Sequence, residues 1–320
     1  MPLHKRSNEE TAEHVAACLQ LAILLEINAP KPGNVHRNAN FHKTNYEHFL
    51  ASTVAAAPSF KIAAMQGIKV AERKINLSNV GIGRIIKDAI ERINTWQHGG
   101  NTLLGTVILL SPIAVAAGKT LKENNNAFDL QKIRKNIKAV TTATKPEDAV
   151  ALYEAISTAK PGGLNKAPRF DVTKASSKQE ILETHTTLFD VFKISARYDS
   201  VSNEWTNNYS IVFDTGFPFL KKELTKNSIN NAVVHTFLKI LAETPDTLIA
   251  RKVGWKKANK ISDQARQILQ LGGLKTQKGR NVLATFDKKL RDSENKLNPG
   301  TTADLITATL ALHVLSGYRP

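Results

Sequence analysis

Residues 102–118 read TLLGTVILLSPIAVAAG, the longest apolar run in the chain. The run is slightly short for a membrane span, and it contains Ser111, Pro112 and two glycines. We therefore interpret it as a buried core helix. Residues 1–10 are polar and contain no apolar secretory core, so we expect a cytoplasmic protein with no membrane partner.

Helical patterns extend in both directions from this run. Ser7 and Glu10 have the spacing of a capping box, and isoleucines recur at helical spacing through residues 81–94. Pro146, followed by two acidic residues, is typical of a helix start. Helices are expected over residues 7–27, 46–73 (with a bend at Pro58), 81–94, 102–118, 129–141, 146–158, 177–195, 228–241, 256–271, 279–291 and 301–316.

This pattern predicts an all-α fold of about ten helices in a single domain over residues 1–320. Residues 207–219 are the one segment with the β-branched and aromatic character of an extended strand. A domain boundary near residues 162–175 is the alternative, because Pro161, two glycines and Pro168 interrupt the helical pattern there.

The charge balance favours an anionic partner. The 320 residues carry 44 basic and 28 acidic side chains, a formal net charge of +16. Such an excess suits a nucleotide, a nucleic acid or a membrane surface, although a lysine-rich solvated surface explains it equally well. The basic residues are scattered and form no arm or tail, so a nucleic-acid partner is not expected. The single cysteine, Cys18, excludes an internal disulfide and a zinc–cysteine cluster.

The first polar motif, residues 30–37, reads PKPGNVHR and follows the first helix. Lys31 and Arg37 could bind phosphate oxygens, and Gly33 would let the backbone approach a ligand closely. His36 could transfer a proton or pair with phosphate. A proline–glycine turn with a solvated basic rim is the simpler interpretation of the same residues.

The second motif, residues 98–105, reads HGGNTLLG and precedes the apolar run. Asn101 or Thr102 can cap the helix and leave its positive dipole end facing outward, where an anion would be favoured. Capping alone also explains these residues. The spacing is not that of a phosphate-binding P-loop, and no lysine follows the glycine.

Two further motifs place an aspartate at a helix start. Residues 245–251 read PDTLIAR, in which Asp246 precedes a short apolar helix and Arg251 follows about one and a half turns later. Asp304 closes the motif NPGTTAD, within the first turn of the last helix. The helix dipole alone favours a carboxylate at this position. A more specific interpretation is that the carboxylate binds Mg²⁺ or accepts a hydrogen bond from a ribose hydroxyl.

Taken together and in this order, the four motifs resemble the triphosphoribosyl-dephospho-CoA synthase family over nearly the whole chain. Residues 145–150 (KPEDAV) and 161–164 (PGGL) also look like the middle region of that family. The resemblance implies an all-helical enzyme that transfers the triphosphoribosyl group of ATP to the 2′-hydroxyl of 3′-dephospho-CoA and releases adenine. A divergent member would use a related nucleotide acceptor.

The resemblance also assigns roles to residues and implies Mg²⁺ bound with ATP. Asp246, Asp304 and His36 are the candidate catalytic groups, and Asp304 is the candidate metal ligand. The candidate substrate-binding residues are Lys31, Gly33, Asn34, Arg37, Asn101, Thr102, Arg251, Asn298 and Gly300.

Two of the motifs depart from the family pattern. Leu103 and Leu104 stand where members often carry His-Lys, and residues 34–37 read NVHR where Leu-Val-Asp-Arg is common. These departures motivate two alternatives: another nucleotide or acceptor, or a non-catalytic nucleotide-binding regulatory protein that retains the pocket. A basic helical nucleic-acid-binding protein is the third hypothesis, with a steep salt dependence as its signature.

Overall fold

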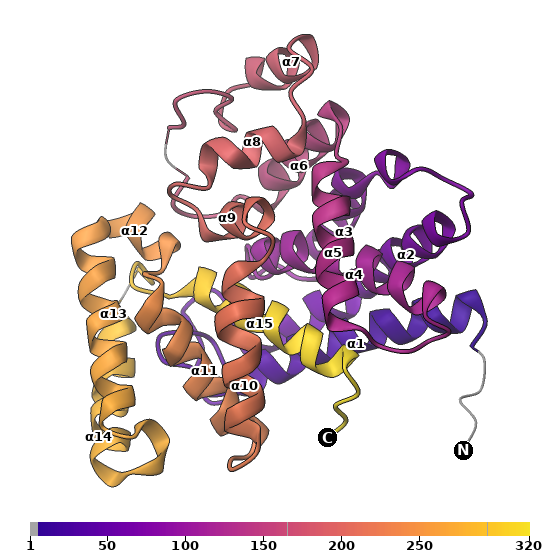
Figure 1. The fold of residues 1–320 in the computed structure, drawn as a ribbon. Helices are drawn as coiled ribbons and strands as arrows, with labels where there is room; N and C mark the ends of the chain where they lie inside the picture. The colour runs from indigo at the N-terminus through magenta and orange to yellow at the C-terminus, as the bar shows by residue number, and fades with distance from the viewer. Residues whose placement is uncertain (1–5, 165, 293) are drawn as a thin grey trace.

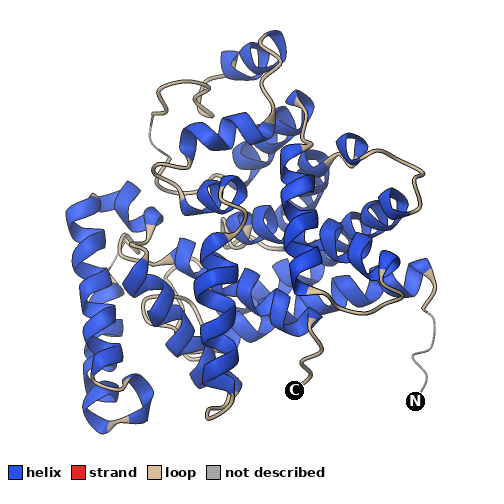
Figure 2. Cartoon of the chain, in the orientation of Figure 1, coloured by secondary structure: helices blue, strands red, loops and turns tan. Residues whose placement is uncertain are grey.

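The computed structural model describes residues 6–164, 166–292 and 294–320. Within these ranges the chain is helical and contains no strand, so the all-α prediction is confirmed (Figure 2). The helices number fifteen in the described residues rather than about ten. They are α1 (Asn8–Asn28), α2 (Tyr46–Ala71), α3 (Ile82–Trp96), α4 (Leu104–Glu123), α5 (Leu130–Thr142), α6 (Pro146–Ala159), α7 (Ser176–Glu183), α8 (Leu188–Ser195), α9 (Ser200–Thr206), α10 (Phe217–Leu224), α11 (Ile229–Glu243), α12 (Thr247–Val253), α13 (Trp255–Gln270), α14 (Gln277–Leu290) and α15 (Gly300–Leu315).

Helix α4 is the buried core helix that the apolar run predicts. It packs against α1, α2, α3, α5 and α15. By length and composition α4 could span a membrane, but 89% of its most apolar window is buried inside the protein. Its approach to α2 is close, because a Cβ atom on Gly67 would lie 1.9 Å from the carbonyl oxygen of Val115. Glycine is therefore required where these two backbones meet.

The starts of α1 and α6 follow the sequence signals, whereas the N-cap of α4 is Leu103 rather than Asn101 or Thr102. The Ser7 hydroxyl accepts the N–H of Glu10, and the Glu10 carboxylate accepts the N–H of Ser7, which completes the predicted capping box. Pro146 occupies the first turn of α6. Buried apolar side chains from α1 through α15 form one contiguous cluster.

Residues 207–219 correct the one prediction of an extended segment. They form a π-helical turn, Ile211–Gly216, that runs directly into α10. The buried Glu204 carboxylate accepts the N–H groups of Ile211 and Val212, each at 2.9 Å. These side-chain acceptors hold the wide helical turn, and they override the strand preference of the β-branched residues.

A break explains one of the additional helices, and α9, α10 and α12 are short helices outside the eleven predicted ranges. The predicted helix over residues 177–195 divides into α7 and α8, and His185 between them has a left-handed φ of 50°. Pro58, in contrast, lies inside one continuous helix, α2. Figure 1 shows α12, α13 and α14 at the left of the molecule and α7 and α8 at the top, with α15 crossing the centre.

Candidate functional site

All four sequence motifs contribute to one cavity of about 760 Å³. The first motif supplies Asn34 and Val35, and the second supplies residues 101–105. The third supplies Arg251 from α12, and the fourth supplies the start of α15. Segments separated by more than two hundred residues in sequence therefore meet around one space large enough for a nucleotide-sized ligand.

The N-terminal turns of α4 and α15 meet in this cavity at Asp304. The Thr106 hydroxyl donates to Asp304 Oδ1 at 2.6 Å. A Cβ atom on Gly105 would lie 2.1 Å from Asp304 Oδ2, so only glycine allows this contact. Burial raises the pKa of Asp304 to about 8, and the negative charge of Glu26 adds to the rise while the Thr106 hydrogen bond opposes it. Asp304 is therefore mainly protonated at neutral pH.

A second carboxyl group on the cavity wall, Glu26 near the end of α1, forms a buried ion pair. Lys31 is fully buried, and its ammonium lies 3.0 Å from Glu26 Oε1. The same ammonium donates to the backbone oxygens of Glu26 and of Ala29, the latter at 3.1 Å. Burial raises the pKa of Glu26 and lowers that of Lys31, and their mutual attraction opposes both shifts. Three acceptor oxygens match the three protons of an ammonium, which favours the ionised pair.

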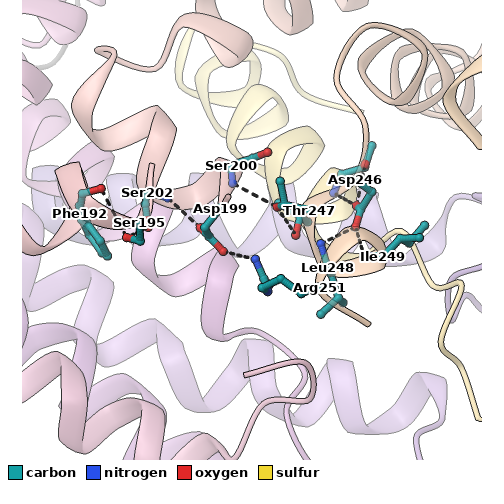
Figure 3. Close-up of polar contacts among 12 residues, drawn as sticks. Phe192, Ser195, Asp199, Ser200, Ser202, Asp246, Thr247, Leu248, Ile249 and Arg251 are labelled. Atoms are coloured by element: carbon teal, nitrogen blue, oxygen red, sulfur yellow. Dashed lines mark hydrogen bonds and ion pairs between the residues drawn. The ribbon is translucent and has the colours of Figure 1, made fainter. Parts of the chain in front are cut away.

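Polar contacts fix the short helix α12 beside the cavity (Figure 3). Arg251 forms an ion pair with Asp199, the N-cap residue of α9. The Thr247 hydroxyl accepts the N–H of Ser200 at 3.1 Å. Asp246 joins α12 to α15: Oδ1 accepts from the first turn of α12, and Oδ2 accepts the N–H and hydroxyl of Thr302 at 2.7 and 2.8 Å.

Cationic side chains line another part of the wall. Lys160 and Lys166 come from the loop after α6, and Lys252 comes from α12. The loop lies against α12, since a Cβ atom on Gly163 would lie 3.3 Å from Lys252 Cγ. Arg169 also lines the cavity, and its guanidinium pairs with Glu180 at 3.1 Å. The cavity thus combines two carboxyl groups with a set of cations.

The cavity brings together seven of the twelve candidate residues. Asn101 Oδ1 accepts the N–H of Leu104 at 3.1 Å, and the Thr102 hydroxyl contacts Ser52 at 2.7 Å. Asn298 Oδ1 is buried and has no hydrogen-bond partner among the described residues, which leaves an acceptor for a ligand. The candidates on the cavity wall are Asn34, Asn101, Thr102, Arg251, Asn298, Gly300 and Asp304.

The other five candidates lie outside the lining of this cavity: Lys31, Gly33, His36, Arg37 and Asp246. Gly33 donates its N–H to Asp287 at 2.7 Å and packs against Leu290. Burial lowers the pKa of His36 to about 4, with Arg291 adding to the shift, so its ring is neutral at pH 7. Arg37 is exposed to solvent. Direct ligand contact stays a prediction for these five residues.

The His, Cys, Asp and Glu side chains of the described residues do not form a metal-binding site of their own. Among the described residues, no group of three or more His, Cys, Asp or Glu side chains could hold a metal ion. Protein sites for Mg²⁺ bound with a nucleotide need only one or two carboxylates, because substrate phosphates complete the coordination. The cavity fits an ion that arrives with its substrate better than a resident metal.

The fold and cavity define an all-helical protein with one cavity of about 760 Å³ that is lined by carboxyl groups and cations. Comparison with known sequences identifies the class further. The chain belongs to the ATP:dephospho-CoA triphosphoribosyl transferase family, whose sequence profile matches residues 12–320. The chain is therefore a transferase of this family, as its four motifs predict.

Individual relatives agree with this membership. A Vibrio cholerae protein named probable 2-(5''-triphosphoribosyl)-3'-dephosphocoenzyme-A synthase is 25% identical over 92% of this chain and 85% of its own length. A Klebsiella pneumoniae protein named as the same synthase is 23% identical over 95% of this chain and 92% of its own. A crystal structure from Archaeoglobus fulgidus, assigned as a triphosphoribosyl-dephospho-CoA synthase, covers 84% of this chain and all of that chain with a TM-score of 0.60 and 23% identity. The structural likeness shows a shared fold.

Proposed function

We propose that this protein transfers the 5-triphosphoribosyl group of ATP to the 2′-hydroxyl of 3′-dephospho-CoA, or of a related nucleotide, and releases adenine. Family membership and the names of the relatives support this reaction. The observation that carries the proposal is the pair of carboxyl groups that line one cavity, Asp304 and Glu26, in different surroundings: burial raises the pKa of Asp304 to about 8, whereas Glu26 pairs with the Lys31 ammonium at 3.0 Å. Enzymes that act at a glycosidic carbon commonly use two carboxyl groups, one protonated as the acid and one ionised as the base or nucleophile.

The reaction requires one bond to break and one to form. The bond from C1′ of the ATP ribose to adenine N9 breaks, and a bond from C1′ to the acceptor 2′-oxygen forms. Asp304, protonated at neutral pH, supplies a proton to the departing adenine. Glu26, ionised beside Lys31, accepts the proton of the 2′-hydroxyl and stabilises positive charge on the sugar. The proton count balances, because one carboxyl loses a proton and the other gains one.

The cationic wall would hold the triphosphate. Lys160, Lys166 and Lys252 supply positive charge, and Arg251, oriented by Asp199, supplies a planar fork. Mg²⁺ would enter as part of the MgATP substrate, coordinated mainly by its phosphates. We assign Asp304 to proton donation rather than to the metal, since coordination would require its ionised form.

The test is adenine release measured by chromatography. Purified protein with MgATP and 3′-dephospho-CoA is expected to release adenine in equal amount to a nucleotide product that carries the added triphosphoribosyl mass. Omission of the acceptor is the control and is expected to abolish sustained release. Thermal stabilisation by ATP without adenine release, across dephospho-CoA and related nucleotides, would contradict the proposal and support the regulatory alternative.

A further inference from the structure

Trp255 differs from the other two tryptophans in its position. Trp205 is 1% exposed, and its indole N–H donates to the backbone oxygen of Ile108 at 3.1 Å. Trp96, at the end of α3, is 61% exposed and lies outside the cavity lining. Trp255 is 46% exposed and lines the cavity. It therefore presents a large aromatic surface at the edge of the candidate active site.

The geometry of α13 explains this placement. The buried residues of α13 recur at helical spacing and mark its inward face, and Trp255 continues that face one turn toward the N-terminus. Gly254, with a φ of 89°, makes the turn between α12 and α13 that starts the helix at this residue. The indole thus extends the inward face of α13 beyond the core and over the cavity.

The surroundings of Trp255 suit a nucleotide. Lys252, three residues earlier, lines the same cavity, and its ammonium donates to the Asn295 oxygen at 3.0 Å. Glycines 162 and 163 lie against the stem of Lys252, so this part of the cavity lining combines residues that lack side chains with a cation. An exposed aromatic ring and cations in the lining of one cavity can bind a base by stacking and its phosphates by charge.

We infer that Trp255 is a stacking platform for the adenine ring of the acceptor nucleotide. This inference rests on the proposed function. In that reaction adenine leaves from C1′ of the ATP ribose, which would lie next to Asp304. Asp304 itself lies where the N-terminal turns of α4 and α15 pack together. The half-exposed edge at Trp255 is then left for the second nucleotide, 3′-dephospho-CoA. Trp255 is accordingly a specificity-determining residue, and it takes no part in proton transfer.

Fluorescence tests binding without turnover. A Trp96→Phe variant, excited where tyrosine does not absorb, keeps Trp255 and the buried Trp205 as its only tryptophans. Dephospho-CoA is expected to quench this variant and to leave the emission of Trp255→Phe unchanged. Absence of quenching, equal quenching in Trp255→Phe, or quenching by MgATP alone would each overturn the inference. This readout does not depend on catalysis, so it remains decisive if the proposed reaction itself fails.

Kinetics give the second readout. Loss of one base-stacking contact corresponds to about a tenfold or greater rise in the KM for dephospho-CoA in Trp255→Ala, with the KM for ATP changed by less than about twofold. Trp255→Phe keeps an aromatic surface and is expected to retain most of the acceptor affinity. Trp96→Phe is the matched control for removal of an exposed tryptophan. An unchanged acceptor KM in folded Trp255→Ala, or a selective rise in the KM for ATP, would overturn the inference.

Discussion

Replacing Lys31 with methionine removes the ammonium that neutralises Glu26 inside the fold. The lysine side chain is fully buried, so no water replaces its contacts to the carboxylate and to two backbone oxygens. Breaking a buried ion pair by removal of one partner costs about 3–5 kcal/mol. That loss is a large part of the ~5–15 kcal/mol that stabilises a typical domain. A lysine that served only to bind phosphate would show no comparable effect on folding.

Urea denaturation at two pH values measures this loss. Burial raises the pKa of Glu26 even with Lys31 present, and removal of the cation raises it further. The folded variant then binds a proton more tightly than the unfolded chain, whose glutamate titrates at about 4.3. Its stability therefore increases as the pH falls through the raised pKa. The destabilisation of Lys31→Met is expected to be larger at about pH 8 than at about pH 5.

The double variant Glu26→Gln/Lys31→Met is the control. It removes both charges, so it is expected to be more stable than Lys31→Met alone, with a coupling free energy of about 1–3 kcal/mol. A loss below about 1 kcal/mol in Lys31→Met at the higher pH, or equal losses in the single and double variants, would refute the buried pair.

Three further predictions concern Asp304, Gly105 and Asp246. The kcat of the wild type should fall as the pH rises through about 8, because Asp304 loses the proton it donates. The Asp304→Asn variant should lower kcat by about 100-fold or more and should not show this fall in kcat above about pH 8. Gly105→Ala should lower turnover and destabilise the fold by about 1–3 kcal/mol in thermal unfolding, because its Cβ would lie 2.1 Å from Asp304 Oδ2. Asp246→Asn should lower the free energy of unfolding by about 2 kcal/mol or more, because its amide would oppose the N–H of Thr302, whereas a purely catalytic aspartate would leave folding unchanged.

Each of these results has a contrary outcome. A flat pH profile above neutrality in the wild type would contradict the proton-donor role of Asp304. Gly162→Ala is the matched control for Gly105→Ala, because its Cβ would meet Lys252 at an ordinary 3.5 Å. Equal activity in the two alanine variants would contradict the close contact. An Asp246→Asn variant of wild-type stability without activity would return Asp246 to the catalytic set.

Local signals predicted much of the fold. The capping box at Ser7, the proline at the start of α6 and the apolar run of α4 each depend on neighbouring residues, and each is found in the structure. The helical form of residues 207–219 depends instead on Glu204 and on the Tyr209 hydroxyl, which donates to the Leu109 oxygen of α4 at 2.9 Å. Such tertiary contacts leave no periodic signal in the segment itself.

The site was predictable where motifs mark helix starts and was not predictable elsewhere. Asp304 stands near the start of α15 and Asn101 lies just before α4, and both line the cavity. The sequence motifs do not predict Glu26 as a site residue, because it lies in none of them. A single carboxylate in the apolar segment LLEI nevertheless indicates a buried residue with a partner. The roles of Lys31 and Asp246 depend on burial, since a sequence motif does not tell a ligand-facing charge from one paired inside the fold.

A crystal structure with MgATP bound would locate the reacting carbon. The triphosphate is expected to lie against Lys160, Lys166 and Lys252, with the ribose C1′ beside the carboxyl groups of Asp304 and Glu26. A nucleotide bound with its ribose outside this cavity, away from both carboxyl groups, would refute the proposed site.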